Sequence, residues 1–453
     1  MIPARLEPSP LPLAFVIVAL GCRGVSDPNV GDLPAAVTCG AAEVFTPVKG
    51  KPSLPADLGR ILACQFIGTR TAAQVSASKQ YQMHGWSAET GYHEYVVQYV
   101  SQGPKGKPNR VSAIVYLPVG GKGPYPIVAV NHGTAGMGPS CGPTHRREYT
   151  DYMALPLAGR GYAVVASDYP GLGVDEGSVH PYGVGESEAL AILDGVRAIR
   201  GFKDPGRWEG GGLADELFLA GHSQGGQATL FAHQYYDASV GVRLLGSITW
   251  APGLGDLRGF NQIVGDSARA IDITTVFVTM VLYGSATYHG APENSAWLTP
   301  GAQLTLPSML RDQCFDKLYL ALPATFPSQG YLFSPGFLAG AKSCAFDGQA
   351  CPQFEPWKGY LDANLPGNFR ADAPALLVQG EKDDIVPAYT TACVAKRMKS
   401  RGSPSVTLCG YAAANHYDIV DYSYDEVLAW MKARREGRTV EACKAPVQAA
   451  CPN

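Results

Sequence analysis

Residues 216–226 read ELFLAGHSQGG, an apolar, strand-like run that passes into a GxSxG motif and then into a segment that favours a helix. A serine in this setting lies on a sharp, strained turn between strand and helix, which exposes its hydroxyl group. Gly221 and Gly225 leave room for the strand and the helix to approach each other closely. We therefore predict that Ser223 is a nucleophile rather than part of an ordinary glycine-rich turn.

A serine hydroxyl is a weak nucleophile, so Ser223 needs a base and the base needs an orienting carboxylate. Where a serine stands on such a turn, the acid and then the histidine follow it along the chain. Residues 375–387, ALLVQGEKDDIVP, form a buried strand that ends in acidic residues, and Asp383 fits the expected spacing. Asp384 is the alternative, with a role in capping the next helix if Asp383 is the acid.

His416 is predicted to be the base. It follows the last expected strand, and one helix over 388–400 fits between it and Asp383. Of the nine histidines in the chain, His222 adjoins Ser223, but a neighbouring side chain on a sharp turn points elsewhere. His132 is expected to order the loop that follows an early strand.

The oxyanion of an acyl-transfer reaction needs two backbone N–H donors. One comes from the residue after the nucleophile, here Gln224. The second is expected from the loop NHGTAG at 131–136, where Thr134 is favoured and Ala135 is the alternative. This loop would otherwise be a glycine turn without a catalytic role.

Apolar, β-branched runs bounded by turn residues predict strands, and the residues between two of them recur at helical spacing over 189–199. Alternating strands and helices indicate an α/β protein whose mostly parallel sheet is flanked by helices. The expected strands are Arg110–Leu117, Tyr125–Val130, Gly161–Ser167, Glu216–Ala220, Leu244–Trp250, Ala375–Gln379 and Ser405–Leu408.

Residues 252–370 interrupt this alternation with aromatic residues, prolines, and two helix-like stretches at Ile271–Tyr283 and Phe315–Leu322. We predict that they form an inserted helical cap, or lid, over the carboxyl ends of the strands, where ligands bind in such sheets. The core would then comprise 61–251 and 371–453, preceded by an irregular arm over 23–60.

Composition narrows the function. Hydrophobic residues make up 46% and charged residues 17% of the chain, and the net charge is −3, so nothing favours a nucleic-acid partner. The sequence has no phosphate-binding loop, dinucleotide fingerprint, HExxH motif or calcium-binding loop. We therefore predict no cofactor and no metal.

Residues 11–20, LPLAFVIVAL, are too short to span a bilayer and have the length of a signal-peptide core. Residues 1–22 are thus expected to be a signal peptide or, because ALGC at 19–22 resembles a lipobox, a lipoprotein signal. The protein would be secreted, or anchored at the surface through a lipid on Cys22.

Eleven cysteines occur in the chain, none at zinc-ligand spacing. Without Cys22 ten remain, enough for five disulfides in an oxidising compartment; the alternative is scattered buried thiols in a cytosolic enzyme. Sequence does not fix the connectivity, but three local pairs are expected: Cys344 with Cys351, Cys393 with Cys409, and Cys443 with Cys451.

Several motifs together resemble the secreted triacylglycerol lipases and esterases of the Candida lipase A type and their bacterial relatives. They are HGT at 132–134, SDYPGLG at 167–173, HPY at 180–182, GESEA at 185–189, GHSQGG at 221–226 and NH at 415–416. The resemblance spans about 90–435. It implies an α/β-hydrolase fold with a helical cap, activity on acylglycerols and simpler esters without a cofactor, and transient contact of the cap with a lipid interface.

Two rivals stay open at this point. The same three residues serve peptidases and polyester hydrolases, because specificity is decided by the pocket and not by the fold. A protein of another class, a cysteine-braced surface protein that binds lipids or partners without catalysis, would not need Ser223, Asp383 and His416 in this order.

Overall fold

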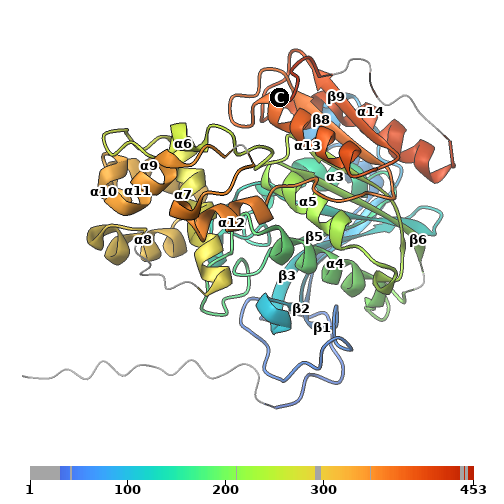
Figure 1. Cartoon of the computed structure of the whole chain (residues 1–453). Coiled ribbons are helices and arrows are strands. Elements are labelled where there is room, and N and C mark those ends of the chain that lie inside the picture. The colour runs from blue at the N-terminus through green and yellow to red at the C-terminus, as the bar shows by residue number, and fades with distance from the viewer. Residues whose placement is uncertain are drawn as a thin grey trace, which may run out of the picture.

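The computed structural model describes residues 31–40, 43–210, 212–290, 297–346, 348–438, 443 and 447–452 (Figure 1). The expected signal segment at 1–22, with Cys22, lies outside the described residues, as does part of the arm over 23–60.

Within the described residues, nine strands form one sheet in the order β1-β2-β3-β5-β4-β6-β7-β8-β9. In this order, β1, β2, β3 and β5 pair antiparallel with one another. The pairs that join β5, β4, β6, β7, β8 and β9 are all parallel. The strands are β1 (Ile61–Arg70), β2 (Gly91–Gln102), β3 (Pro108–Val119), β4 (Tyr125–Asn131), β5 (Ala163–Ser167), β6 (Leu213–His222), β7 (Arg243–Trp250), β8 (Ala375–Gly380) and β9 (Val406–Tyr411).

Helices cover both faces of the parallel strands, and the side chains of β4 show how. Ile127 and Ala129 belong to the cluster under α4 (Gly185–Gly201) and α5 (Gln224–Tyr235). Val128 and Val130 belong to the cluster under α3 (Asp151–Ala158) and α14 (Ile419–Arg435). Because alternate residues of a strand face opposite sides, a strand with a continuous apolar run, such as Ile127–Val130 of β4, requires this double cover.

Near the amino terminus the short helices α1 (Ala72–Ser76) and α2 (Lys79–His84) link β1 to β2. Near the carboxyl terminus α13 (Ala388–Ser400) links β8 to β9 and packs on Leu377. Single turns of 3-10 helix occur at Pro104–Gly106, Pro139–Cys141, Arg147–Tyr149, Ala238–Val240 and Pro352–Phe354.

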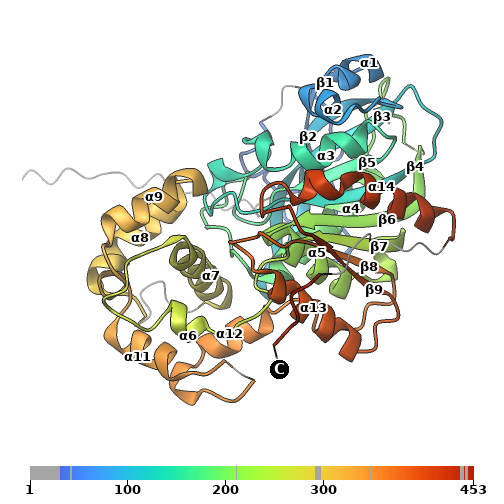
Figure 2. The same cartoon turned by 90° about the horizontal axis from the view of Figure 1, so that it is seen from above.

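Between β7 and β8 the chain forms helices that pack with one another in a separate apolar cluster. Figure 2 shows them beside the sheet rather than on either of its faces. The two helix-like stretches of the sequence fall in α7 and α9. The helices are α6 (Phe260–Ile263), α7 (Ile273–His289), α8 (Pro300–Asp312), α9 (Phe315–Thr325), α10 (Gln329–Leu332), α11 (Pro335–Ser343) and α12 (Trp357–Ala363); we call α6–α12 the cap helices.

Five disulfides link the described cysteines, which confirms the expected oxidised state. They are Cys39–Cys64, Cys141–Cys314, Cys344–Cys351, Cys393–Cys451 and Cys409–Cys443. The first expected pair, Cys344 with Cys351, is present.

The other two expected pairs, Cys393 with Cys409 and Cys443 with Cys451, are wrong. On β9, Leu408 faces α13, whereas Cys409 faces the opposite cluster beside α14. Cys393 lies on α13, so the sheet separates it from Cys409. Each of the two therefore pairs with a cysteine of the carboxyl-terminal tail on its own side.

Candidate active site

Ser223 lies between β6 and α5 in the conformation that the GxSxG motif predicts. Its backbone has φ 58° and ψ −119°, a region that non-glycine residues rarely adopt. The Ser223 N–H donates to the Trp250 carbonyl at 2.9 Å, which holds the turn. A Cβ at Gly221 would lie 2.2 Å from the Gly225 carbonyl oxygen, and one at Gly225 would lie 1.9 Å from that of Asn131. Both positions therefore require glycine.

The structure brings Ser223, His416 and Asp383 together. Nε2 of His416 lies 3.0 Å from the Ser223 hydroxyl oxygen, and Nδ1 lies 2.8 Å from a carboxylate oxygen of Asp383. The imidazole and the carboxylate are buried. With Nδ1–H donated to the carboxylate, Nε2 is left to accept the serine proton.

Asp383 is held by its own turn. Its Oδ1 accepts from the N–H groups of Ile385 and Val386 at 3.0 and 2.7 Å, and its Oδ2 accepts from the Gln379 amide at 3.1 Å. These donors fix the carboxylate toward His416. The neighbouring Asp384 is exposed and lines a cavity described below.

His222 contacts the backbone of His416, a role that the sequence did not reveal. One ring nitrogen of His222 lies 2.8 Å from the His416 carbonyl oxygen, and the other lies 2.9 Å from the Tyr152 hydroxyl. Burial lowers the pKa of His222 to about 3, with a smaller contribution from the charge of His416. His222 is therefore neutral at ordinary pH and braces the backbone of His416.

Gln224 and Thr134 both lie beside Ser223. Gln224 is the first residue of α5, where an N–H has no partner within its helix. A Cβ at Gly133 would lie 3.7 Å from the Ser223 Cβ, so the loop that carries Thr134 runs next to the nucleophile. The Thr134 hydroxyl is 2.7 Å from that of Tyr182. The alternative, Ala135, gives its carbonyl to the Phe315 N–H of α9 at 2.9 Å.

His132 orders this loop as expected. Its Nδ1 lies 2.7 Å from the Gly133 carbonyl oxygen, and its ring stacks on Tyr169 with centroids 4.2 Å apart. Burial lowers the pKa of His132 to about 3, with a smaller opposing effect from its bond to Gly133.

The side chain of Gln224 is anchored by a buried polar group. Its Nε2 donates to Glu188 Oε1 at 2.7 Å and lies 2.7 Å from Nε2 of His180. Glu188 and His180 are fully buried. Glu188 directly precedes the apolar residues that predicted a helix at 189–199. A charged residue at this position was the available signal for this support, although the sequence did not show which residue it would contact.

An apolar cavity of about 320 Å³ opens at Ser223. Tyr182 and Gln224 stand beside the nucleophile, and the loop 253–258 after β7 forms one side. Apolar side chains supply much of the lining: Leu254, Leu257, Phe260, Ile263, Phe277, Val278, Val281 and Leu361. Such a cavity suits an uncharged, largely apolar group bound to Ser223.

In the part of the chain that the structure describes, no three His, Cys, Asp or Glu side chains gather as metal ligands would. None of the described helices is both long and apolar enough to cross a bilayer.

Residues 141–259 match the family model of secretory lipases. This confirms the resemblance to secreted lipases over a segment that contains Ser223 and Gln224 but neither Asp383 nor His416. No curated protein sequence matches the chain significantly.

Two of the solved structures that share the fold of this chain are an esterase and a lipase. The rice cell wall degrading esterase LipA from Xanthomonas oryzae has a TM-score of 0.65 at 22% identity, covering 83% of this chain and 95% of LipA. Candida antarctica lipase A in its closed state has a TM-score of 0.64 at 18% identity, covering 88% of each chain. The chain thus has the α/β-hydrolase fold, and the family match supports a carboxylic ester hydrolase.

Proposed function

We propose that the chain is a serine hydrolase that cleaves carboxylic esters, either acylglycerols or simpler esters, through an acyl-enzyme. The observation that carries the proposal is the hydrogen-bond path from Asp383 through His416 to Ser223, which ends at the mouth of an apolar cavity. The family match over 141–259 supports the same reaction class.

In the first half-reaction, the Ser223 oxygen attacks the ester carbonyl while His416 Nε2 takes the hydroxyl proton. The tetrahedral intermediate then expels the alcohol, which receives that proton from His416, and the acyl group stays on Ser223. In the second half-reaction a water molecule gives its proton to His416 and attacks the acyl carbonyl. Collapse releases the acid and returns the proton to Ser223. Asp383 stabilises the imidazolium that forms in each half.

The oxyanion would be bound by the N–H groups of Gln224 and Thr134, with each donor contributing about 3 kcal/mol to the transition state. One observation supports Gln224 here: its N–H stands at the start of a helix, where the dipole favours negative charge.

We also propose that the protein is exported, either secreted or anchored through Cys22. Its five disulfides and the name of the matched family support export. A lipid substrate would be met by the cap helices, which expose large apolar side chains at Leu304, Leu320 and Tyr331. This contact would be transient.

The test is hydrolysis of p-nitrophenyl esters, from acetate to palmitate, by the wild type and Ser223→Ala. We expect kcat to fall about 10⁴-fold or more in the variant, because the groups of such a triad act as a unit. Ser308→Ala, an exposed serine on α8, is the control and should keep full activity.

Folded wild-type protein that cleaves none of these esters would contradict the proposal. Cleavage of peptides or polyester films would then favour one of the other hydrolases on this fold. Inactivity on all three substrate classes, with binding of lipid vesicles, would favour a surface binding protein.

A further inference from the structure

The cavity at Ser223 is separated from a second cavity by a thin set of side chains. The second cavity has a volume of about 560 Å³, and its lining includes Gly259, Gln262, Arg269 and Pro452. Four residues line both cavities: Asp256, Arg258, Ile263 and Tyr389. These four side chains therefore stand between the two spaces, and three of them, Asp256, Arg258 and Tyr389, carry polar groups where the cavity at Ser223 borders the outer one.

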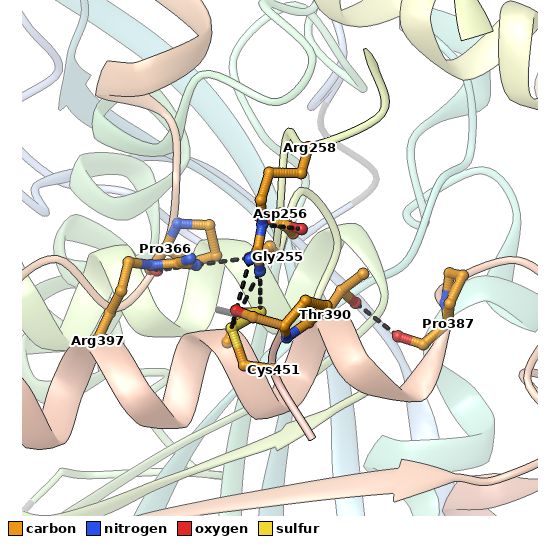
Figure 3. Close-up of a disulfide and its surroundings, with 10 residues drawn as sticks. Gly255, Asp256, Arg258, Pro366, Pro387, Thr390, Arg397 and Cys451 are labelled. Carbon is orange, nitrogen blue, oxygen red and sulfur yellow. Dashed lines mark hydrogen bonds and ion pairs between the residues drawn. A yellow bond between two sulfur atoms is a disulfide. The ribbon is translucent and has the colours of Figure 1, made fainter. Parts of the chain in front are cut away.

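Arg258 is held in this position by four partners, of which Figure 3 labels Asp256 and Cys451. Its Nε donates to both carboxylate oxygens of Asp256 at 3.0 and 3.1 Å. One terminal nitrogen donates to the Pro452 carbonyl at 2.5 Å. The other contacts both sulfurs of the Cys393–Cys451 disulfide at 2.9 and 3.1 Å. Moving the guanidinium aside would break all of these contacts.

The backbone beneath Arg258 is equally fixed. Arg397 of α13 donates to the Gly255 carbonyl at 2.7 Å and, with the same nitrogen, to that of Pro366 at 2.9 Å. A Cβ at Gly255 would lie 2.8 Å from the Thr390 carbonyl oxygen, so the loop packs directly on α13. Figure 3 shows this helix running under the loop. The loop therefore has no room to retreat when the cavity fills.

We propose that Asp256, Arg258 and Tyr389, here called the end wall, set the longest acyl chain that the cavity accepts, so that the enzyme prefers esters of short and medium-chain acids. This inference rests on the proposed ester hydrolysis. An acyl chain that extends from Ser223 along Phe277 and Val278 gains free energy from each buried methylene group until it reaches the wall. There it meets a partly exposed ion pair, and a chain that pushed further would have to displace the water around these charges, which is unfavourable.

The wild type alone already tests the wall. The value of kcat/KM on p-nitrophenyl esters should hold or rise from butyrate to octanoate and fall at least about tenfold from octanoate to palmitate, because the longer chain can enter only by displacing the end wall. A wild type that hydrolyses palmitate as well as octanoate would overturn the inference and leave the proposed hydrolysis intact.

The decisive variant is the double substitution Asp256→Ala with Arg258→Ala, which removes both charges and leaves neither buried alone. The palmitate-to-butyrate ratio of kcat/KM should rise about tenfold or more, because two or more further methylene groups become buried in the joined cavities. Arg269→Ala is the control: Arg269 lines only the outer cavity, so the ratio should stay as in the wild type.

Tyr389→Ala opens the same wall from α13 without touching the ion pair, and it should raise the ratio even if the double variant does not fold. An unchanged ratio in a variant that still hydrolyses butyrate would overturn the inference. So would a length limit that appears with alkyl acetates instead, because the cavity would then hold the alcohol. If the wild type showed no butyrate hydrolysis that depends on Ser223, the proposed function would be wrong, and the inference with it.

Discussion

Different forces hold two regions of the molecule in shape: the turns at the carboxyl ends of the parallel strands, and the cap helices. At the sheet, directional hydrogen bonds fix Asp383 and His416, and a strained turn fixes Ser223. In the cap, side chains such as Phe277 and Val281 are held by packing within one apolar cluster. Apolar packing tolerates exchange of side chains of similar volume, whereas an oriented carboxylate does not. We therefore expect the sheet to determine the reaction, and the cap helices together with the end wall to determine which ester binds.

The largest effect should come from Asp383→Asn. An amide at this position favours the wrong tautomer of His416, so kcat should fall about 10⁴-fold while KM changes little. Asp384→Asn, one residue away and exposed, is the matched control and should stay near wild-type kcat. Steady-state kinetics on p-nitrophenyl butyrate measure both. Equal losses in the two variants would break the contrast, because the acid would then act through general charge and not through its hydrogen bond.

A smaller effect is expected from Val278→Trp, which places a large ring in the cavity from α7. Overpacking costs about 1–3 kcal/mol, so kcat/KM on octanoate should fall about 5- to 150-fold. The acetate ester, which needs little of the cavity, should be hydrolysed within a few-fold of the wild type. Leu304→Trp, at a cap position that is 86% exposed, should change neither value. An equal loss on both esters would mean that the cap also positions the reacting groups.

The smallest effect concerns stability in acid. Burial lowers the pKa of His233, under the sheet, to about 4 from its ordinary value of 6.5. Between these two pH values the unfolded chain binds a proton that the folded chain does not, so stability is lost as pH falls from 6.5 to 4. The loss reaches about 3 kcal/mol below pH 4.

The substitution His233→Asn should therefore flatten the dependence of Tm on pH over this range, as measured by calorimetry at several pH values. The cap offers a comparison in His289, whose pKa is also lowered by partial desolvation, although that residue is exposed. His289→Asn should flatten the curve less. A larger effect at His289 would show that the cap, and not the sheet, limits acid stability.

The sequence predicted most of the parallel part of the sheet because buried strands there are continuous apolar runs. All seven expected strands correspond to β3–β9, and the expected helix at 388–400 matches α13. The edge strand β1 and its neighbour β2 were not predicted. Their residues mix polar and apolar side chains, as in Gln98 and Ser101 of β2, whose partners come from distant parts of the chain.

The three catalytic candidates could be named from order and spacing alone, and the structure places them within hydrogen-bond distance; their roles stay a prediction until kinetics test them. Their supports could not be named, because the contacts of His222 and Glu188 join segments far apart in sequence. The cysteine pairs expected around α13 and β9 were wrong for a related reason: the sheet separates cysteines that lie close along the chain.

The Cys141–Cys314 bridge joins the start of α9 to the segment that follows the loop 131–136, and the Phe315 N–H donates to the Ala135 carbonyl beside it. Because the bridge is covalent, the first turn of α9 cannot separate from this loop. We therefore expect any opening of the cap at an oil–water boundary to keep that turn in place while helices such as α7 and α8 shift around it.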